Sequence, residues 1–240
     1  MAEPPFARRF LADLRERATP EQAERYRLAF RHAEDDEFLG VPMGEVFALA
    51  KASADADLAE IEELLESPVH EMRVGAVSVM DFQARGRRTP ADRRRELFEL
   101  YLRRHDRIDN WDLVDRSAPH VVGGYLLDRP RDVLYELARS GVVWERRTAI
   151  VATDVFIRRG DLDDTYRIAE LLLGDEHDLI HKAVGGWVRA AGAKDGPRLL
   201  RFLDEHAAAM PRTTLRYAIE HLDPDRRAHY RGLPRGRDRA

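Results

Sequence analysis

The sequence predicts an all-α protein built as a solenoid of paired helices, and three observations support this fold class. Short apolar segments with helical spacing recur along the 240 residues, separated by turns that contain proline or glycine. No segment shows sustained alternation of apolar and polar residues, so we expect no sheet. A short motif with a basic residue also recurs, which indicates an internal repeat.

The composition sets limits on the class of protein. The chain is 44% hydrophobic and 35% charged, which allows a core together with a long solvated surface. It contains no cysteine, so disulfides and thiolate metal sites are excluded. Neither a signal peptide nor a stretch of about 18 apolar residues is found, and we expect a cytoplasmic protein without membrane contacts. We expect it to act as a monomer.

The charges are distributed unevenly. The formal net charge is -4, which argues mildly against a plain nucleic-acid binder. Residues 33–66 are acidic, whereas residues 85–104 and the end of the chain are rich in arginine. This asymmetry indicates either a basic face on an acidic body or arginines that only solvate helices.

The helices can be predicted in order from their start signals and apolar spacing. The first covers residues 4–18, and a second begins at Thr19 and Pro20, because threonine is a good N-cap and proline fits the first helical position. The second is expected to end near His32. Further helices are predicted from Val46, over 57–66, from Ser67, from Thr89 to Arg104, from Asn110, from Asp128 to Ala138, and over 143–158, 161–173, 174–191, 197–209 and 213–222.

The predicted organisation is a single domain over residues 1–232. Beyond it, residues 233–240 consist mainly of arginine, glycine and proline. We expect this tail to be flexible.

The stretch NWDLVD at residues 110–115 combines several helix-start features. Asn110 is a good N-cap, and Asp112 falls in the first turn, where the helix dipole favours a carboxylate. Trp111 and Asp115 are four residues apart and therefore share a helix face. This pair suits a cationic substrate, although a buried tryptophan beside a solvated aspartate is the simpler alternative.

A basic residue followed by small and β-branched apolar residues recurs along the chain. Arg147, Lys182 and Arg216 are separated by about one helix pair, close to the ~40 residues of HEAT-like units, and Arg73 lies about two repeats upstream. Stacked pairs form a right-handed or C-shaped solenoid with a concave face. If the second helix of each pair lines that face, these residues form a basic column that suits the phosphates of a duplex.

Three motifs carry a resemblance to a known family. They are Trp111-Asp112-Leu113-Val114-Asp115, Trp144-Glu145-Arg146-Arg147-Thr148-Ala149-Ile150 and His181-Lys182-Ala183-Val184-Gly185. In this order they resemble the AlkD-like DNA alkylation repair proteins, which are DNA glycosylases with HEAT-like repeats. The similarity extends from about Phe6 to Leu222.

The resemblance implies excision of N3- or N7-alkylated purines from double-stranded DNA, which is held in the concave groove without a base-flipping pocket. By position, Asp115 resembles the catalytic carboxylate, Trp111 the aromatic that packs on the deoxyribose of the lesion, and Arg147 the basic residue that holds the nearby backbone. Lys182, Arg189, Arg212, Arg216 and Trp187 are the further expected DNA contacts. No metal and no organic cofactor is implied.

The chemistry agrees with these roles. An alkylated purine cation is already an activated leaving group, so a general acid is dispensable. Scission of the C–N bond builds positive charge on the sugar, as in glycoside hydrolysis. An ionised carboxylate near C1′ stabilises that charge and orients water.

One departure from the family pattern concerns a second stacking tryptophan, which directly follows a glycine in that pattern. Here the order is Gly185-Gly186-Trp187, so Gly186 takes the tryptophan position and Trp187 is turned by about 100° around the helix. The second aromatic wall is therefore expected to be absent, which leaves room for a bulkier adduct.

Other interpretations remain open. His177 and His181 are spaced as a metal pair but have no obvious third ligand. The arginines at 93–95 suit either a phosphate or solvent. No nucleophile elbow supports a hydrolase triad. A catalytically silent scaffold that binds DNA or a protein is the alternative function, favoured by Gly186 and disfavoured by the intact Trp111 and Asp115.

Overall fold

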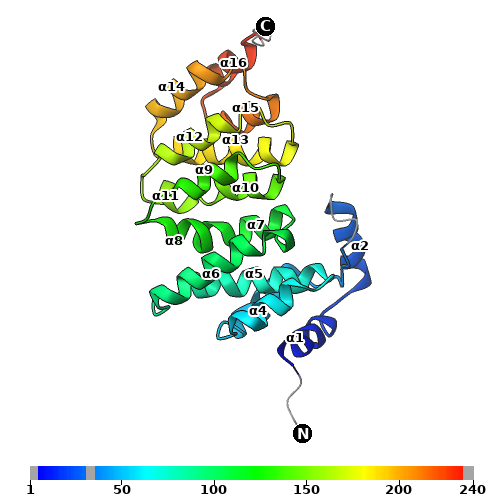
Figure 1. Cartoon of the computed structure of the whole chain (residues 1–240). Coiled ribbons are helices and arrows are strands. Elements are labelled where there is room, and N and C mark those ends of the chain that lie inside the picture. The colour runs from blue at the N-terminus through cyan, green and yellow to red at the C-terminus, as the bar shows by residue number, and fades with distance from the viewer. Residues whose placement is uncertain (1–4, 31–35, 235–240) are drawn as a thin grey trace. The chain divides into compact units, whose positions relative to one another are not determined.

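The chain folds entirely into helices where the structure describes it (Figure 1). The computed structural model describes residues 5–30 and 36–234. Within these ranges the only β contact is a single parallel bridge between Glu37 and Val69. The all-α prediction is confirmed, and the helices stack in pairs as a helical-repeat solenoid does.

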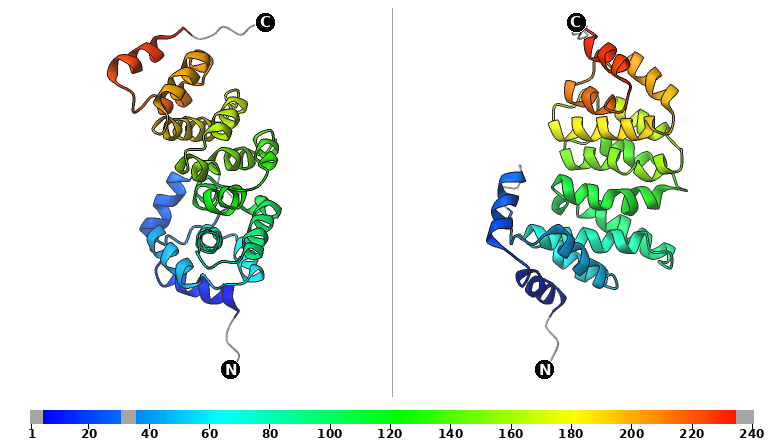
Figure 2. Two further views of the ribbon diagram at one scale, coloured as in Figure 1. Left: turned by 90° about the vertical axis from the view of Figure 1, so that its left-hand side faces the viewer. Right: turned by 180° about the vertical axis from the view of Figure 1, so that it is seen from behind.

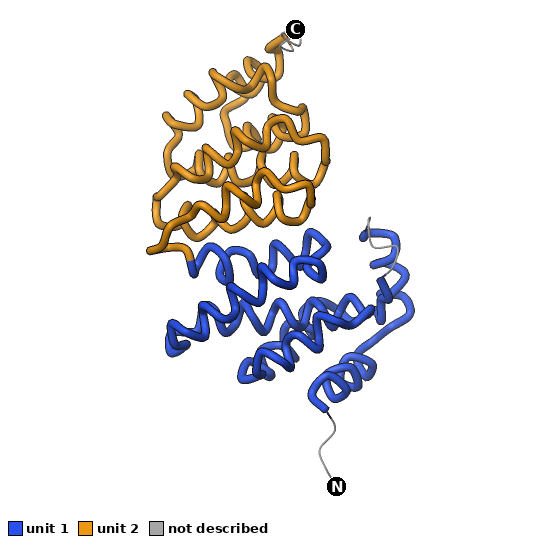
Figure 3. Tube along the Cα trace, viewed as in Figure 1, with its two compact units in different colours: residues 1–125 blue, residues 126–240 orange. Residues whose placement is uncertain are grey.

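The chain divides into two compact units, Met1–Tyr125 and Leu126–Ala240 (Figure 3). Leu233 and Pro234 follow the last helix, and residues 235–240 of the predicted tail lie outside the described residues. No helix in the described ranges is both long enough and apolar enough to span a bilayer.

The first unit is organised around α5. Its elements are α1 (Phe6–Arg15), α2 (Pro20–Ala29), α3 (Met43–Ala52), α4 (Leu58–Leu65), α5 (His70–Ala84), α6 (Ala91–Arg103), the 3-10 turn η1 (His105–Arg107), α7 (Trp111–Ala118), the π-helical turn η2 (Pro119–Gly123) and α8 (Gly124–Leu126). Helix α5 packs against α3, α4 and α7, and every one of its residues except Phe82 is buried. Charged residues of α5 must therefore find partners inside the unit.

The starts of the early helices follow their sequence signals. The Thr19 hydroxyl accepts a hydrogen bond from the amide of Gln22 at 3.3 Å, as the predicted N-cap requires. Asp57 and Glu60 form a reciprocal capping box at α4. Helix α2 ends at Ala29, because the next residue has an extended backbone. The predicted end at His32 lies outside the described residues.

The second unit consists of two layers of helices. Its elements are α9 (Asp132–Ala138), α10 (Val143–Val151), α11 (Asp154–Arg158), α12 (Asp163–Leu171), α13 (Asp178–Gly192), α14 (Gly196–His206), α15 (Arg212–Ala218) and α16 (Pro224–Gly232). Helices α10, α13 and α15 lie side by side in one layer, and α9, α12 and α14 pack behind them (Figure 2). Each helix pair therefore contributes one member to each layer, as in HEAT-like repeats.

Three features of the helices were not predicted. The helix predicted over 143–158 is two helices, because the chain turns at Ala152 and Thr153. The chain stays helical through Pro119 by widening into a π turn, in which the Gly124 amide bonds the Pro119 carbonyl. Helix α16 was not predicted, although Asp223 caps it and Pro224 begins it, because its arginine-rich sequence lacks an apolar stripe.

Candidate active site

Trp111 stands at the start of α7 with much of its side chain accessible. Asn110 has the extended backbone of an N-cap, and its side-chain oxygen accepts the Trp111 amide at 2.8 Å. The predicted cap is therefore present. Trp111 is 37% exposed, so it is not the buried packing tryptophan of the simpler alternative.

An aromatic ring that sequence analysis missed covers one face of this indole. The ring of Phe30, the residue directly after α2, stacks on the indole of Trp111, with ring centroids 5.6 Å apart and an angle of 12° between the ring planes. Phe30 also contacts the imidazole of His70, with ring centroids 4.9 Å apart. Because Phe30 is 81 positions before Trp111 in the sequence, no local pattern indicated the stack.

Asp115 lies one helical turn after Trp111 on α7 and is half-buried. The intervening residues Leu113 and Val114 are fully buried, so they fix α7 against the core of the first unit. The helix face that carries Trp111 and Asp115 therefore has a defined orientation.

Asp112, between these two residues, belongs to a buried network that the sequence did not reveal. Its Oδ2 lies 2.8 Å from Nε2 of His70, and Nδ1 of the same imidazole lies 2.8 Å from Oδ2 of Asp36. Arg73, one turn beyond His70, donates to Asp36 at 2.5 Å and to Asp109 at 3.3 Å. Two cations and three carboxylates thus join α5, α7 and the loop before α3.

Burial and pairing act in opposite directions on His70. Burial lowers the pKa of the imidazole, but the hydrogen bonds and charges of Asp112 and Asp36 outweigh it and raise the pKa from 6.5 to about 9. For Asp36, burial raises the pKa, whereas the contacts with His70 and Arg73 lower it below its usual value. Both shifts favour the charged forms of the pair.

Arg73 and Arg147 are buried members of the predicted basic column. Arg73 is 1% exposed and Arg147 is 5% exposed. Within the second unit, Arg147 donates to the carbonyl oxygen of Leu179 at 2.7 Å and so connects α10 to the first turn of α13. Its neighbour Arg146 forms an ion pair with Asp175 at 2.5 Å.

The other predicted DNA contacts lie on α13 and α15, which pack against each other in the second unit. Lys182 forms an ion pair with Asp178 at 2.5 Å, and Arg189 forms one with Glu220. Two further arginines, Arg212 and Arg216, are exposed. These side chains supply positive charge on two neighbouring helices of one layer.

Arg212 and Arg216 are held by contacts near their own helix. Arg212 donates to the carbonyl oxygen of Arg231 at 3.0 Å. The guanidinium of Arg216 lies over the ring of Tyr217, 5.0 Å from its centroid. Both contacts leave the positive charge at the surface of the second unit.

The sequence matches the model of a family described as DNA alkylation repair enzymes over residues 10–222. The chain belongs to this family. A solved structure of a predicted DNA alkylation repair enzyme from Enterococcus faecalis has the same fold, with a TM-score of 0.70 and 17% sequence identity. The match covers 87% of this chain and 98% of that chain. No curated protein sequence matches this one.

In this DNA alkylation repair family member, the adjacent glycines Gly185 and Gly186 of α13 have very different surroundings. A Cβ atom added to Gly185 would clash with α15, whereas one added to Gly186 would meet nothing within 4 Å. Trp187 follows them and is half-buried, and its indole nitrogen is enclosed without a hydrogen-bond partner among the described residues. A side chain at position 186 would therefore begin in open space.

His177 and His181, which have the spacing of a metal pair, have other partners. The His177 side chain accepts the Leu179 amide at 3.2 Å and caps α13, and His181 Nε2 lies 2.5 Å from the Asp175 carbonyl oxygen. Neither contact brings a third metal ligand to the pair.

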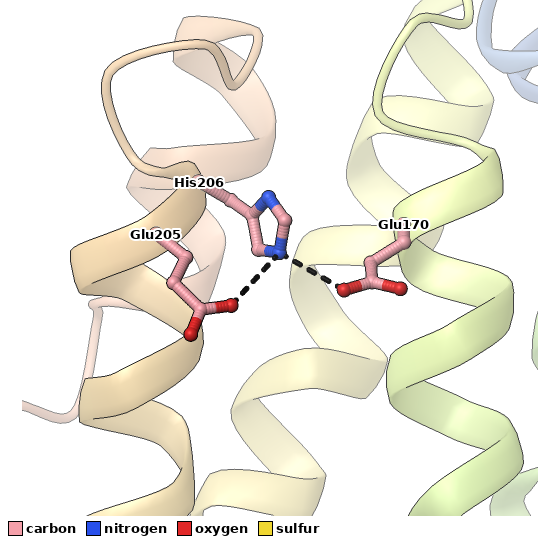
Figure 4. A group of neighbouring side chains, drawn as sticks. All are labelled: Glu170, Glu205 and His206. Atoms are coloured by element: carbon pink, nitrogen blue, oxygen red, sulfur yellow. Dashed lines mark hydrogen bonds and ion pairs between the residues drawn. The ribbon is translucent and has the colours of Figure 1, made fainter.

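One group in the described part of the chain has ligand atoms within 4.8 Å of one another, namely Glu170, Glu205 and His206 (Figure 4). His206 lies 3.0 Å from Glu170 and 3.7 Å from Glu205. Both glutamates are exposed. Three ligands are fewer than a closed zinc site uses, and we assign this group to surface ion pairing.

Proposed function

We propose that this protein is a DNA glycosylase that excises positively charged N3- and N7-alkylated purines from duplex DNA. The observation that carries the proposal is the pair formed by Trp111 and Asp115. An accessible indole and a carboxylate stand one turn apart at the start of α7. Membership of the DNA alkylation repair enzyme family supports the choice of DNA and of damaged bases.

In the proposed reaction, the bond between C1′ of the deoxyribose and the base nitrogen breaks, and its electron pair leaves with the base. The base enters as a cation and leaves neutral, so no proton has to be donated to it. The ionised carboxylate of Asp115 stabilises the positive charge that moves to the sugar. A water molecule adds to C1′ and releases a proton, which completes the hydrolysis.

Trp111 supports this step by packing its exposed indole face on the sugar. Attraction between an indole and a cation is worth about 0.5–2 kcal/mol. Because Phe30 covers the other face of the indole, only one face and the ring edge remain for DNA. The scheme uses no metal or organic cofactor.

The basic side chains of the second unit are proposed to bind the phosphates of the duplex. Lys182, Arg189, Arg212 and Arg216 provide positive charge on α13 and α15, and Trp187 adds an aromatic contact. Arg147 is proposed to hold the backbone near the lesion. Phosphate contacts position a duplex without reading its sequence, which suits a repair enzyme that meets lesions in any context. The proposal includes action as a monomer in the cytoplasm.

The test is release of free 7-methylguanine and 3-methyladenine from methylated duplex DNA by wild type and Asp115→Asn. The substitution keeps the size of the side chain and removes its charge. We expect release by wild type and a loss of at least about 100-fold in the variant, as is typical when a group that stabilises developing charge is removed. Asp92→Asn is the matched control, because Asp92 is an exposed carboxylate of α6 that pairs with Arg95 at the surface.

The alternative is a catalytically silent scaffold that binds DNA or a protein. It is favoured by Gly186, which leaves the position of a second aromatic wall empty. Salt-dependent duplex binding without base release would select a DNA-binding scaffold. Neither binding nor release would select a protein-binding one.

A further inference from the structure

We propose that His70, held as an imidazolium between Asp36 and Asp112, is a positioning residue that sets the orientation of the α7 start and thereby of Trp111 and Asp115. This inference deepens the proposed function and rests on it for its catalytic part. The two ring nitrogens of His70 contact Asp36 and Asp112. His70 would act on Trp111 and Asp115 through Asp112.

The geometry favours the charged form of His70. Each ring nitrogen lies 2.8 Å from a carboxylate oxygen, and an ionised carboxylate can only accept hydrogen bonds. A neutral imidazole has one N–H and can satisfy only one of them, whereas the imidazolium donates to both. Because His70 is fully buried, water cannot replace the missing bond.

Several charged groups surround the His70 imidazole. Asp36 comes from the loop before α3, Asp112 from α7, and Arg73 from α5 itself, with its guanidinium 3.5 Å from His70 Nδ1. Asp109 lies beyond Arg73, and the ring of Phe30 from the end of α2 covers the imidazole. The two carboxylates in direct contact offset the repulsion between His70 and Arg73.

Glu71, the neighbour of His70, faces in another direction. Its carboxylate accepts backbone amides of Leu39, Gly40 and Val41 at 2.8–3.2 Å. It fixes the loop that follows Asp36, so the loop end of the network is anchored independently of His70.

The contact with Asp112 explains why the network would reach the candidate active site. Asp112 is the second residue of α7, between Trp111 and the turn that carries Asp115. A hydrogen bond from a buried cation to a residue of the first turn resists sliding or rotation of that turn. Displacement of a reacting group by about 1 Å can cost about 100-fold in rate, so a fixed first turn has a direct catalytic consequence.

The first arm of the test uses the protein without DNA. NMR follows the His70 imidazole and the Trp111 indole N–H from pH 6 to pH 10, with His70→Gln and Trp111→Phe used for assignment. We expect His70 to titrate near pH 9 and the Trp111 signal to move with the same midpoint. In Asp36→Asn, which removes one facing charge, both midpoints should fall by about one pH unit or more. If the chemical shift of the Trp111 indole N–H does not change as His70 titrates, the proposal is wrong.

The second arm measures single-turnover release of 7-methylguanine between pH 6 and pH 9, corrected for loss without enzyme. We expect the alkaline limb of the rate to move to lower pH in Asp36→Asn, and His70→Gln to be about 10- to 100-fold slower at every pH. His206→Gln is the matched control, because His206 also contacts a carboxylate but lies on α14. It should leave the profile unchanged.

The two arms separate the possible failures. A purely structural role for His70 predicts lower rates without a shifted limb in Asp36→Asn, and this result would contradict the proposal. If wild type releases no base at any pH, the proposed glycosylase activity is wrong, while the first arm still decides whether His70 sets the position of Trp111. If His70→Gln does not fold, comparison of wild type with Asp36→Asn is sufficient for both the NMR titration and the pH profile of base release.

Discussion

Gly185 of α13 packs directly on the backbone of Thr214 of α15: a Cβ atom at position 185 would lie 2.5 Å from the Thr214 carbonyl oxygen. It would also lie 2.6 Å from Cβ of Tyr217, whereas the same atom at Gly186 would meet nothing within 4 Å. The first glycine is therefore required by helix packing. The second is not required by any contact in the second unit.

This difference predicts opposite effects of two matched substitutions. Gly185→Ala should lower the free energy of unfolding by about 1–3 kcal/mol, because α13 and α15 must separate to admit the methyl group. Gly186→Ala should be neutral or stabilising by up to about 1 kcal/mol, because alanine is the better helix former. Urea unfolding of both variants checks the prediction. Equal losses at the two positions would contradict the packing argument.

Gly186→Trp should change the range of lesions if the proposed function is correct. A Cβ atom at position 186 would meet nothing within 4 Å, and a tryptophan there would stand at the position of the second aromatic ring expected for the family. We expect reduced excision of bulky adducts relative to methylated bases, measured by competing both substrates in one reaction, with Gly186→Ala as control. If excision of bulky adducts falls no more than excision of methylated bases, the hypothesis that Gly186 widens the site is wrong.

The folded protein should lose stability as the pH rises through the titration of His70. Its pKa is raised from 6.5 to about 9 in the folded state, so the stabilisation is complete below pH 6.5 and disappears as the pH passes 9. One pH unit of pKa difference corresponds to about 1.4 kcal/mol, so the loss is on the order of 3 kcal/mol. Urea unfolding at pH 6.5 and pH 9.5 measures it.

The variant Asp36→Asn isolates the contribution of this pair from other groups that titrate in the same range. It removes one of the two charges that raise the His70 pKa. The drop in stability between the two pH values should therefore be smaller in Asp36→Asn than in wild type. A drop of the same size would assign the pH dependence to other residues.

Arg147 and Arg216 should respond differently to replacement by alanine. Arg147 is buried and donates to the Leu179 carbonyl oxygen, so Arg147→Ala should cost about 1–3 kcal/mol of stability by removing a buried hydrogen bond from a charged donor. Arg216 is exposed, so Arg216→Ala should leave stability unchanged and weaken duplex binding.

Duplex affinity at several salt concentrations checks the second half of this prediction. Loss of one phosphate contact should reduce the slope of log K against log salt by about one. Arg158→Ala is the matched control, because Arg158 is an exposed arginine of α11 paired with Asp154. A slope that changes equally in both variants would indicate a general charge effect in place of a contact by Arg216.

Much of the fold could be predicted because helix signals are local. Thr19 and Asn110 cap their helices as expected, since a cap depends on residues within one turn. The recurrence of basic and small residues indicated the repeat for the same reason, because each helix pair repeats its own pattern. The missed α16 marks the limit of this approach, since a polar helix without an apolar stripe has no periodic signal.

The sequence by itself determined the all-α repeat fold, the family, and the placement of Trp111 and Asp115 on one helix face, because all of these depend on short-range spacing. Only the tertiary structure decided which charges are buried and which rings stack. Asp36 and Asp112 reach His70 from 34 and 42 residues away. Such contacts depend on how separate helices pack in three dimensions, and helical periodicity contains no information about that packing.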